Sequence, residues 1–186
     1  MLLLDFCTIS GNPVKTYQGL RKYIATGDVD NNIIVNHELV SYDSKPSRAN
    51  LEAHAGEILF AKMMGTNKVL ICDSDNESNI YSTGFCVLKP NNSVRTKYLY
   101  YYLNSPDFIR QKDKNCSGAT QKAINNDSLK KITINRVPNL NRQDNIVVEL
   151  DNVGKLMELK RNQLLLLDQM VKSQFVNHLT HGGVVC

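Results

Sequence analysis

The chain has 186 residues, of which 42% are hydrophobic and 22% charged, and its formal net charge is +4. This size and composition suit one ordinary folded domain with an appendage, and they exclude a disordered or fibrous chain. Met1–Leu4 is followed at once by Asp5 with no basic flank, so no signal peptide is expected. No apolar run approaches the roughly 18 residues of a membrane span, and we therefore expect a cytoplasmic protein.

The cysteines are odd in number, widely spaced and never in a Cys-x-x-Cys pair, which argues against a disulfide framework and a zinc site. They are Cys7, Cys72, Cys86, Cys116 and Cys186. The histidines show no metal-ligand spacing either. We expect reduced cysteines that pack in the core, and neither a metal nor a cofactor.

The first half of the chain predicts short strands. Apolar and β-branched runs alternate with Asn, Asp and Gly. The runs are residues 23–28, 33–35, 57–63, 68–72 and 80–88. Because the short turn 64–67 separates the third run from the fourth, we expect a hairpin there. A mixed or antiparallel sheet follows.

Helices replace strands from Thr96 onward. Ser105 followed by Pro106 is typical of a helix start, so we expect two short helices with a break near Asn104. The tyrosines between residues 98 and 102 could stack on bases, but successive helical positions favour packing. A polar loop at 116–126, a helical turn at 127–131 and a strand at 132–134 should follow, and Pro138 should end the domain.

Positive charge gathers in residues 93–136, where nine basic residues face three acidic ones, a net charge of +6. The remaining residues carry 13 basic and 15 acidic side chains, a net charge of −2. Such an excess is typical of a surface that binds a polyanion, because neutralised phosphates release counterions. A solvated helix face would show the same pattern.

A long helix is predicted from Asn141 to His178, since that stretch has no proline and only Gly154 interrupts its helical composition. About 38 residues at a rise of 1.5 Å make a rod of roughly 57 Å. Residues that step alternately by four and three form a coiled-coil seam. The seam is Ile146, Leu150, Val153, Met157, Lys160, Leu164, Leu167, Val171, Gln174 and His178.

Motifs of common enzymes are missing from the sequence. There is no dinucleotide-binding GxGxxG, no GxxxxGK[ST] phosphate loop and no GxSxG elbow. The cofactor loop and catalytic tetrad of an amino-methyltransferase are also absent, and no pair of carboxylates can be assigned acid and base roles. We therefore expect a chain without catalytic activity.

Several segments, in their order and spacing, resemble the specificity subunits of type I restriction-modification systems. The resemblance runs from about Thr8 to Leu179. The matching pieces are residues 23–29, 56–62, 82–88, 98–103, 118–124, 132–134, 138–140 and 167–175.

The resemblance implies an α+β fold, in which a mixed-sheet target-recognition domain is followed by a long helix that forms an antiparallel coiled coil with a partner helix. With Pro138 as the end of the domain, we expect bounds of 1–138 for DNA recognition and 139–179 for the spacer. The last residues match nothing in the family, and we expect a disordered tail at 180–186. The implied function is sequence-specific recognition of a bipartite target in double-stranded DNA. The implied partners are methyltransferase and restriction subunits.

The sequence departs from that family pattern in two respects. It holds one recognition domain and one helix, where a typical member has two of each, so either a second copy supplies the other helix in a homodimer or a second half is missing. Arg142-Gln143 stands where the family usually has Glu-Gln. An acidic residue would suit the helix dipole better, so this end could fray or be bound differently.

The DNA-binding candidates come from the basic segment and the basic loops before it. For phosphate contacts they are Lys45, Arg48, Lys62, Arg110, Lys112, Lys114 and Lys122. For base edges they are Asn67, Arg48 and Gln121, although Gln121 could equally stabilise its own loop. Two alternatives stay open, a coiled-coil scaffold that does not read DNA, and the recognition part of a fused methyltransferase-nuclease.

Overall fold

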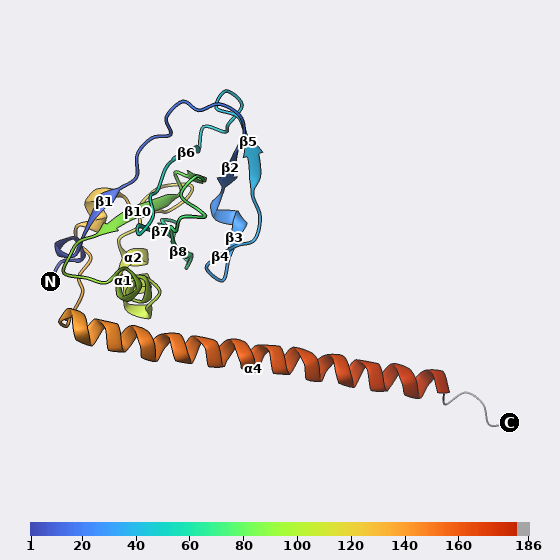
Figure 1. Ribbon diagram of the computed structural model, residues 1–186. Coiled ribbons are helices and arrows are strands. Elements are labelled where there is room, and N and C mark those ends of the chain that lie inside the picture. The colour runs from blue at the N-terminus through green and yellow to red at the C-terminus, as the bar shows by residue number, and fades with distance from the viewer. Residues whose placement is uncertain (182–186) are drawn as a thin grey trace. The chain divides into compact units, whose positions relative to one another are not determined.

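The structure is a computed structural model that describes the backbone of residues 1–181 and the side chains through residue 175 (Figure 1). The predicted disordered tail lies at the edge of this range, and residues 182–186 lie outside it. The chain divides into two compact units, Met1–Asp144 and Asn145–Cys186. The division falls slightly after Pro138, inside the long helix.

Two four-stranded sheets and a small two-stranded one form the first unit. In the first sheet, the order is β1 (Cys7–Ser10), β10 (Phe85–Pro90), β7 (Ile58–Ala61) and β8 (Val69–Ile71), all antiparallel. The pairing of β7 with β8 confirms the predicted hairpin.

The second sheet has the order β5 (Glu38–Val40), β2 (Arg21–Ile24), β9 (Ile80–Ser82) and β6 (Ala49–Leu51). Its β2 and β9 are parallel and its other pairs antiparallel, so the sheet is mixed. The two-stranded sheet pairs β3 (Val29–Asp30) with β4 (Ile33–Ile34). The predicted α+β class is confirmed.

The prediction of one strand over 80–88 is wrong, because β9 and β10 belong to different sheets. The chain turns at Thr83 and Gly84, where the Gly84 amide donates to Ser82 Oγ at 3.1 Å. A Cβ at Gly84 would lie 3.1 Å from Thr26 Cγ2, so the turn packs closely against a distant segment. The division falls at the polar Ser82-Thr83-Gly84 within this run, and the close packing against Thr26 accompanies the turn.

Two other predicted strands are shorter than expected. The run from Tyr23 ends at Ile24 and continues as the 3-10 turn η2 (Thr26–Asp28), which the Asp28 carboxylate closes by accepting from the Ala25 amide at 2.7 Å. The predicted strand 132–134 is only an isolated bridge between Leu2 and Thr133. It lies beside the N-terminal turn η1 (Leu3–Asp5).

The short helices agree with expectation. Helix α1 (Thr96–Leu103) ends at Asn104, and α2 (Pro106–Lys114) starts after Ser105, whose side chain accepts from the Phe108 amide. Helix α3 (Asn126–Leu129) is capped by the side chain of Asn125.

The main core lies where α1 and α2 meet the first sheet (Figure 1). Phe108 of α2 meets Phe60 of β7 edge to face, with the ring centroids 5.2 Å apart. Tyr98, Tyr100 and Tyr102 of α1 pack against this core, so packing rather than base stacking accounts for them.

The long helix α4 (Leu140–His181) has 42 residues, which corresponds to about 63 Å. Its side chains between residues 148 and 175 are exposed, apart from the half-buried Asp151, and many of them are large and apolar. The predicted seam positions Val153, Met157, Leu164 and Val171 are each more than half exposed. The seam position His178 lies outside the described side chains. Among the described residues, no helix is long and apolar enough to cross a membrane.

Side-chain hydrogen bonds hold the first turns of α4 to the domain, which agrees with the second of the two expectations, that this end is bound differently. The Asn139 side chain accepts from the Arg142 amide at 3.0 Å and caps the helix. Gln143 is completely buried and bonds to the backbone of Ser93 and Arg95. An acidic residue at 142 is therefore not needed, because the next side chain anchors this end.

Candidate nucleic-acid interface

Residues far apart in the sequence meet around the turn between β9 and β10. The Thr83 amide donates to the Arg48 carbonyl at 2.9 Å, and the Lys62 amide donates to the Gly84 carbonyl at 2.9 Å. The backbones of Arg48 and Lys62, two of the candidate DNA-binding residues, are therefore both hydrogen-bonded to the Thr83–Gly84 turn. The exposed side chain of Arg48 and the half-buried side chain of Lys62 lie at this place.

The turn between β7 and β8, residues 62–68, borders the same place. Lys68 Nζ donates to the Thr26 carbonyl at 2.7 Å, and this joins the turn to η2. Asn67 is exposed within it.

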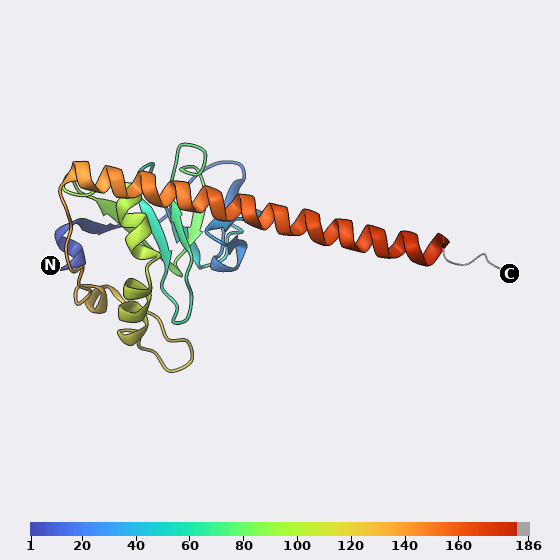
Figure 2. The same cartoon turned by 90° about the horizontal axis from the view of Figure 1, so that it is seen from below.

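The polar loop 117–123 lies against this turn. The Met64 amide donates to the Lys122 carbonyl at 2.9 Å, and the Ile124 amide donates to the Lys62 carbonyl at 3.0 Å. Figure 2 shows the two loops at the same edge of the domain. Gln121 and Lys122 are exposed. The convergent face, as we define it, consists of residues 26–27, 48, 62–68, 83–84 and 117–123.

Gly118 makes the tight path of the loop 117–123 possible. Its φ is +132°, and a Cβ there would lie 2.6 Å from the Gln121 carbonyl oxygen. A side chain at this position would therefore collide with backbone and be strained. The conformation that presents Gln121 and Lys122 depends on this glycine.

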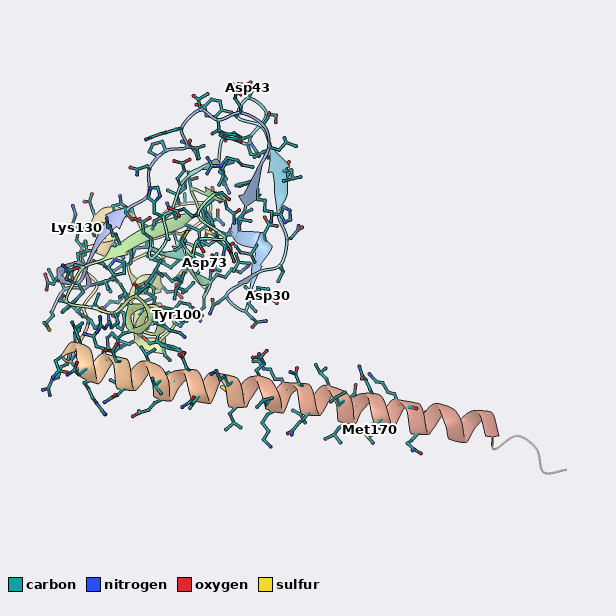
Figure 3. All side chains as sticks on the ribbon, in the orientation of Figure 1. Asp30, Asp43, Asp73, Tyr100, Lys130 and Met170 are labelled. Carbon is teal, nitrogen blue, oxygen red and sulfur yellow. The ribbon has the colours of Figure 1, made fainter. Side chains whose placement is uncertain are left out.

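Lys45 lies in the loop between β5 and β6, and its ammonium group is bonded close to that loop's own residues. Its Nζ donates to the Ala49 carbonyl at 2.9 Å and lies 5.4 Å from the centre of the Tyr42 ring. The neighbouring Asp43 lies at the outer edge of the domain (Figure 3). Lys45 is half-buried, and its bonds stabilise the loop that ends at Arg48.

The expectation that Lys112 contacts phosphate is wrong. Its residue is only 1% exposed, and its ammonium is bonded to the carbonyls of Met63 and Thr66 and to the Asp113 carboxylate. All three of its donors have partners inside the protein.

The basic segment 93–136 does not form one surface. Arg110 pairs with Asp107 on α2, Lys130 pairs with Asp127 at 2.8 Å, and Arg95 pairs with Asp144 at 2.8 Å. Lys130 and Asp43 lie at well-separated edges of the domain (Figure 3). The other exposed basic residues include Lys114, Lys122, Lys131 and Arg136, of which Lys122 lies in the loop 117–123 and Lys114 just before it.

A hollow of about 180 Å³ adjoins the convergent face at Lys62 and Thr83. Ser10 and Asn126 line it together with apolar residues of β1 and β10. Ser10 Oγ is the one buried polar side-chain atom without a hydrogen-bond partner among the described residues.

The buried cysteines do not form a nucleophilic site. Burial raises the pKa of Cys7 and of Cys86 to about 12 each, and that of Cys72 to about 11. Such thiols stay protonated near neutral pH and are poor nucleophiles. Among the described residues, no group of three or more His, Cys, Asp or Glu side chains could hold a metal ion.

The model of the type I restriction modification DNA specificity domain matches residues 5–168 of the chain. The chain belongs to this family. A curated relative, the specificity subunit of the type I restriction enzyme HindI from Haemophilus influenzae, is 27% identical over 158 residues. That alignment covers 82% of this chain and 34% of the relative.

Solved structures of type I systems share the fold of this specificity-domain chain. The HsdS subunit from Thermoanaerobacter tengcongensis matches 98% of it at a TM-score of 0.72 and 21% identity. A chain from a structure on complex assembly and conformational transition of the type I R-M system matches 100% at a TM-score of 0.78 and 20% identity. The specificity-domain chain covers 49% and 50% of these two, about half of their length.

The convergent face also contains two uncharged Thr-Gly pairs that are not among the candidates chosen by charge. Thr26-Gly27 and Thr83-Gly84 are identical dipeptides within segments that carry the family resemblance. Neither is charged, so a search for phosphate-binding side chains omits both. The specificity domain brings them together at the close contact between Thr26 and Gly84.

Proposed function

We propose that this chain is the non-catalytic DNA-recognition subunit of a type I restriction-modification complex, and that the unit Met1–Asp144 reads a sequence in double-stranded DNA. Family membership supports this proposal. The observation that carries it is the convergence of three basic segments: the backbones of Arg48 and Lys62 are hydrogen-bonded to the Thr83–Gly84 turn, and the Lys122 carbonyl accepts from Met64 in the adjoining β7–β8 turn. Backbone hydrogen bonds thus bring together three segments that are far apart in the chain.

The proposed contacts are of two kinds, to phosphates and to base edges. Arg48, Lys62, Lys122 and the nearby Lys114 supply positive charge for phosphates, which positions the domain without reading sequence. Exposed Asn67 and Gln121 supply amide groups, which can form paired hydrogen bonds with adenine in the major groove. Arg48 can also pair with guanine.

The salt dependence of binding tests the phosphate contacts. A duplex enriched by the full chain from a random-sequence library serves as the specific probe, and a scrambled duplex of equal composition serves as the nonspecific one. Because each neutralised phosphate contributes about 0.9 to the salt slope of log K, Arg48→Gln and Lys122→Gln should each lower the slope by about one.

Lys131→Gln is the matched control, because Lys131 is exposed but lies outside the convergent face. It should leave affinity and slope nearly unchanged. Equal slopes for all three variants would place the DNA elsewhere. If the unmodified chain binds all duplexes equally, even with a methyltransferase subunit present, it does not read sequence.

The exposed seam of α4 further supports pairing with a second copy of this chain in an antiparallel coiled coil. Leu164, Leu167 and Val171 are each more than half exposed, and a helix with such a stripe buries it against a partner. Two copies would read two half-sites, and the methyltransferase and restriction subunits would assemble on them. A rod of about 63 Å limits the half-site spacing to about 18 base pairs.

A coiled-coil scaffold that does not read DNA would use the same seam. It would form the dimer and show no enriched sequence. The recognition part of a fused methyltransferase-nuclease would read DNA but depend on catalytic domains in the same chain. Methyltransferase and ATP-dependent restriction genes beside this one would favour the type I complex over both.

A further inference from the structure

An ion pair on α2, between buried Lys112 and half-buried Asp113, holds the backbone of the β7–β8 turn, residues 62–68. Lys112 Nζ donates to the carbonyl oxygens of Met63 at 2.7 Å and Thr66 at 2.9 Å. It also lies 2.9 Å from Asp113 Oδ1. That same carboxylate oxygen accepts a hydrogen bond from the Gly65 amide at 3.1 Å. Two adjacent helix residues therefore bond three backbone groups of one turn.

Lysine is almost never fully buried unless it is paired, because removing its charge from water is costly. Lys112 is 1% exposed, yet its partners lie on a surface turn, not in the middle of the core. A hydrophobic residue at this place would avoid the desolvation cost. The buried charge instead determines where the turn's carbonyl groups lie.

The turn has further restraints on the opposite side. Its Met64 amide donates to the Lys122 carbonyl, so the turn and the loop 117–123 hold each other. Gly65 has a φ of +73°, a left-handed conformation that favours glycine. The backbone is held while the side chains of Met64 and Asn67 stay exposed. This arrangement presents side chains from a fixed frame.

We propose that Lys112 and Asp113 are positioning residues for sequence recognition: they hold the β7–β8 turn so that Asn67 and the adjoining Lys122 meet the DNA in one geometry. The inference rests on the proposed function. It gives Lys112 a role that differs from a phosphate contact, since its ammonium does not reach the solvent. Such a role affects specific binding, which needs exact geometry, more than nonspecific binding, which needs charge.

Two substitutions with opposite effects on net charge test this role in the full chain. Lys112→Met removes a positive charge, and Asp113→Asn removes a negative one and so raises the net charge by one. If charge alone mattered, Lys112→Met would weaken binding and Asp113→Asn would strengthen it. Positioning predicts that both lower affinity for the library-enriched duplex about 10-fold to 100-fold.

For the scrambled duplex, positioning predicts affinities within about 2-fold of the unmodified chain and an unchanged salt slope, because no phosphate contact is lost. Lys114→Met is the matched control, since Lys114 is exposed on the same helix. As a direct contact it should lower both affinities and reduce the slope. Thermal unfolding should show that each variant is folded at the binding temperature.

Three outcomes overturn the inference. If the Lys112→Met and Asp113→Asn variants are folded and bind the enriched duplex normally, Lys112 and Asp113 contribute only to the stability of the fold. A reduced salt slope for Lys112→Met would make it a phosphate contact. Opposite effects of the two variants would show that only charge matters. If Lys112→Met does not fold, Asp113→Asn alone decides, because charge and positioning predict opposite signs for it. No enriched sequence for the unmodified chain would overturn the proposed function itself, and this inference with it.

Discussion

Asn32 and Asn104 join the small β3–β4 hairpin to the end of helix α1. Asn32 Nδ2 donates to Asn104 Oδ1 at 2.8 Å, while Asn32 Oδ1 accepts from the Val69 amide of β8 at 2.8 Å. Asn104 in turn donates to the Tyr100 carbonyl at 2.9 Å. One side chain thus connects a hairpin turn, a strand of the main sheet and a helix terminus.

Two substitutions at Asn32 distinguish the contribution of its hydrogen bonds to stability from that of its backbone conformation. Its φ is +62°, which glycine adopts freely and alanine does not. We expect Asn32→Gly to lower the free energy of unfolding by about 1–3 kcal/mol through the lost bonds. Asn32→Ala should lower it by about 1 kcal/mol more. Urea denaturation measures both values.

Asn31→Gly is the control, because Asn31 also has a positive φ but its side chain bonds only to exposed Asp30. We expect a change within about 0.5 kcal/mol. An equal loss for Asn31→Gly and Asn32→Gly would mean that the Asn32 bonds add nothing.

The buried side chain of Gln143 should be essential for joining the first turns of α4 to the domain. It accepts from the Arg95 amide at 2.8 Å and donates to the carbonyls of Ser93 at 3.0 Å and Pro138 at 2.8 Å. Gln143→Ala leaves these partly buried groups without their partner and removes a buried side chain, so we expect a loss of about 1–3 kcal/mol in the free energy of unfolding.

Gln163→Ala is the matched control on the same helix. Gln163 is exposed and accepts only from the Lys160 ammonium, so its loss should cost less than about 0.5 kcal/mol. Denaturation followed by tyrosine fluorescence compares the two variants. Similar stability of both would contradict the anchoring role of Gln143.

The proposed homodimer predicts that the mass of the full chain in solution is twice that of one copy at micromolar concentration. Leu164→Asp places a charge within the seam, where it would be buried against the partner, so we expect the dimer to dissociate at least about 100-fold more readily. Asn162→Asp introduces the same side chain outside the seam and should leave the mass unchanged. Light scattering that shows a monomer for the unmodified chain would exclude this pairing.

The raised pKa values of Cys7, Cys72 and Cys86 predict a stability that falls in alkaline solution. Their folded pKa values are about 11 to 12, above the value of about 8.5 for an exposed thiol. Between these values the unfolded chain releases protons that the folded chain retains. The free energy of unfolding therefore decreases as pH rises from about 9 to about 12.

Urea denaturation at pH 8 and at pH 10.5, under a reducing agent, checks this expectation. Cys86→Ala should reduce the pH dependence, because it removes one buried thiol and the charge that helps to raise the pKa of Cys7. In a Cys116→Ser/Cys186→Ser background, the three buried thiols should resist alkylation at pH 8 until urea is added. Rapid alkylation of the folded chain would show that these thiols are accessible.

Local chemistry made part of the fold predictable. The Ser105–Pro106 start of α2 depends on one hydroxyl cap and one restricted φ, both encoded by adjacent residues. The hairpin of β7 and β8 follows from two apolar runs with a short turn between them. Helix α4 was expected from its lack of proline, and it extends only a few residues beyond the predicted ends.

Predictions that depended on distant contacts did less well. The division of residues 80–88 into β9 and β10 falls at the polar Ser82-Thr83-Gly84, but the assignment of the two strands to different sheets depends on partners distant in sequence. Charge counting placed Lys112 among the phosphate contacts, because the acceptors that bury it lie on another element. Arg48, Lys62 and Lys122 were chosen from the sequence, but only folding brought their segments together.

The sequence by itself determined the family, the helix starts and the long rod with its apolar seam, because periodicity, caps and breakers act over a few residues. Tertiary structure alone decided which basic side chains face solvent and which are bonded internally. Whether a lysine binds phosphate or holds a turn depends on the acceptors within about 3 Å of its ammonium. For Lys112 those acceptors are the Met63 and Thr66 carbonyls, which only the folded chain places there.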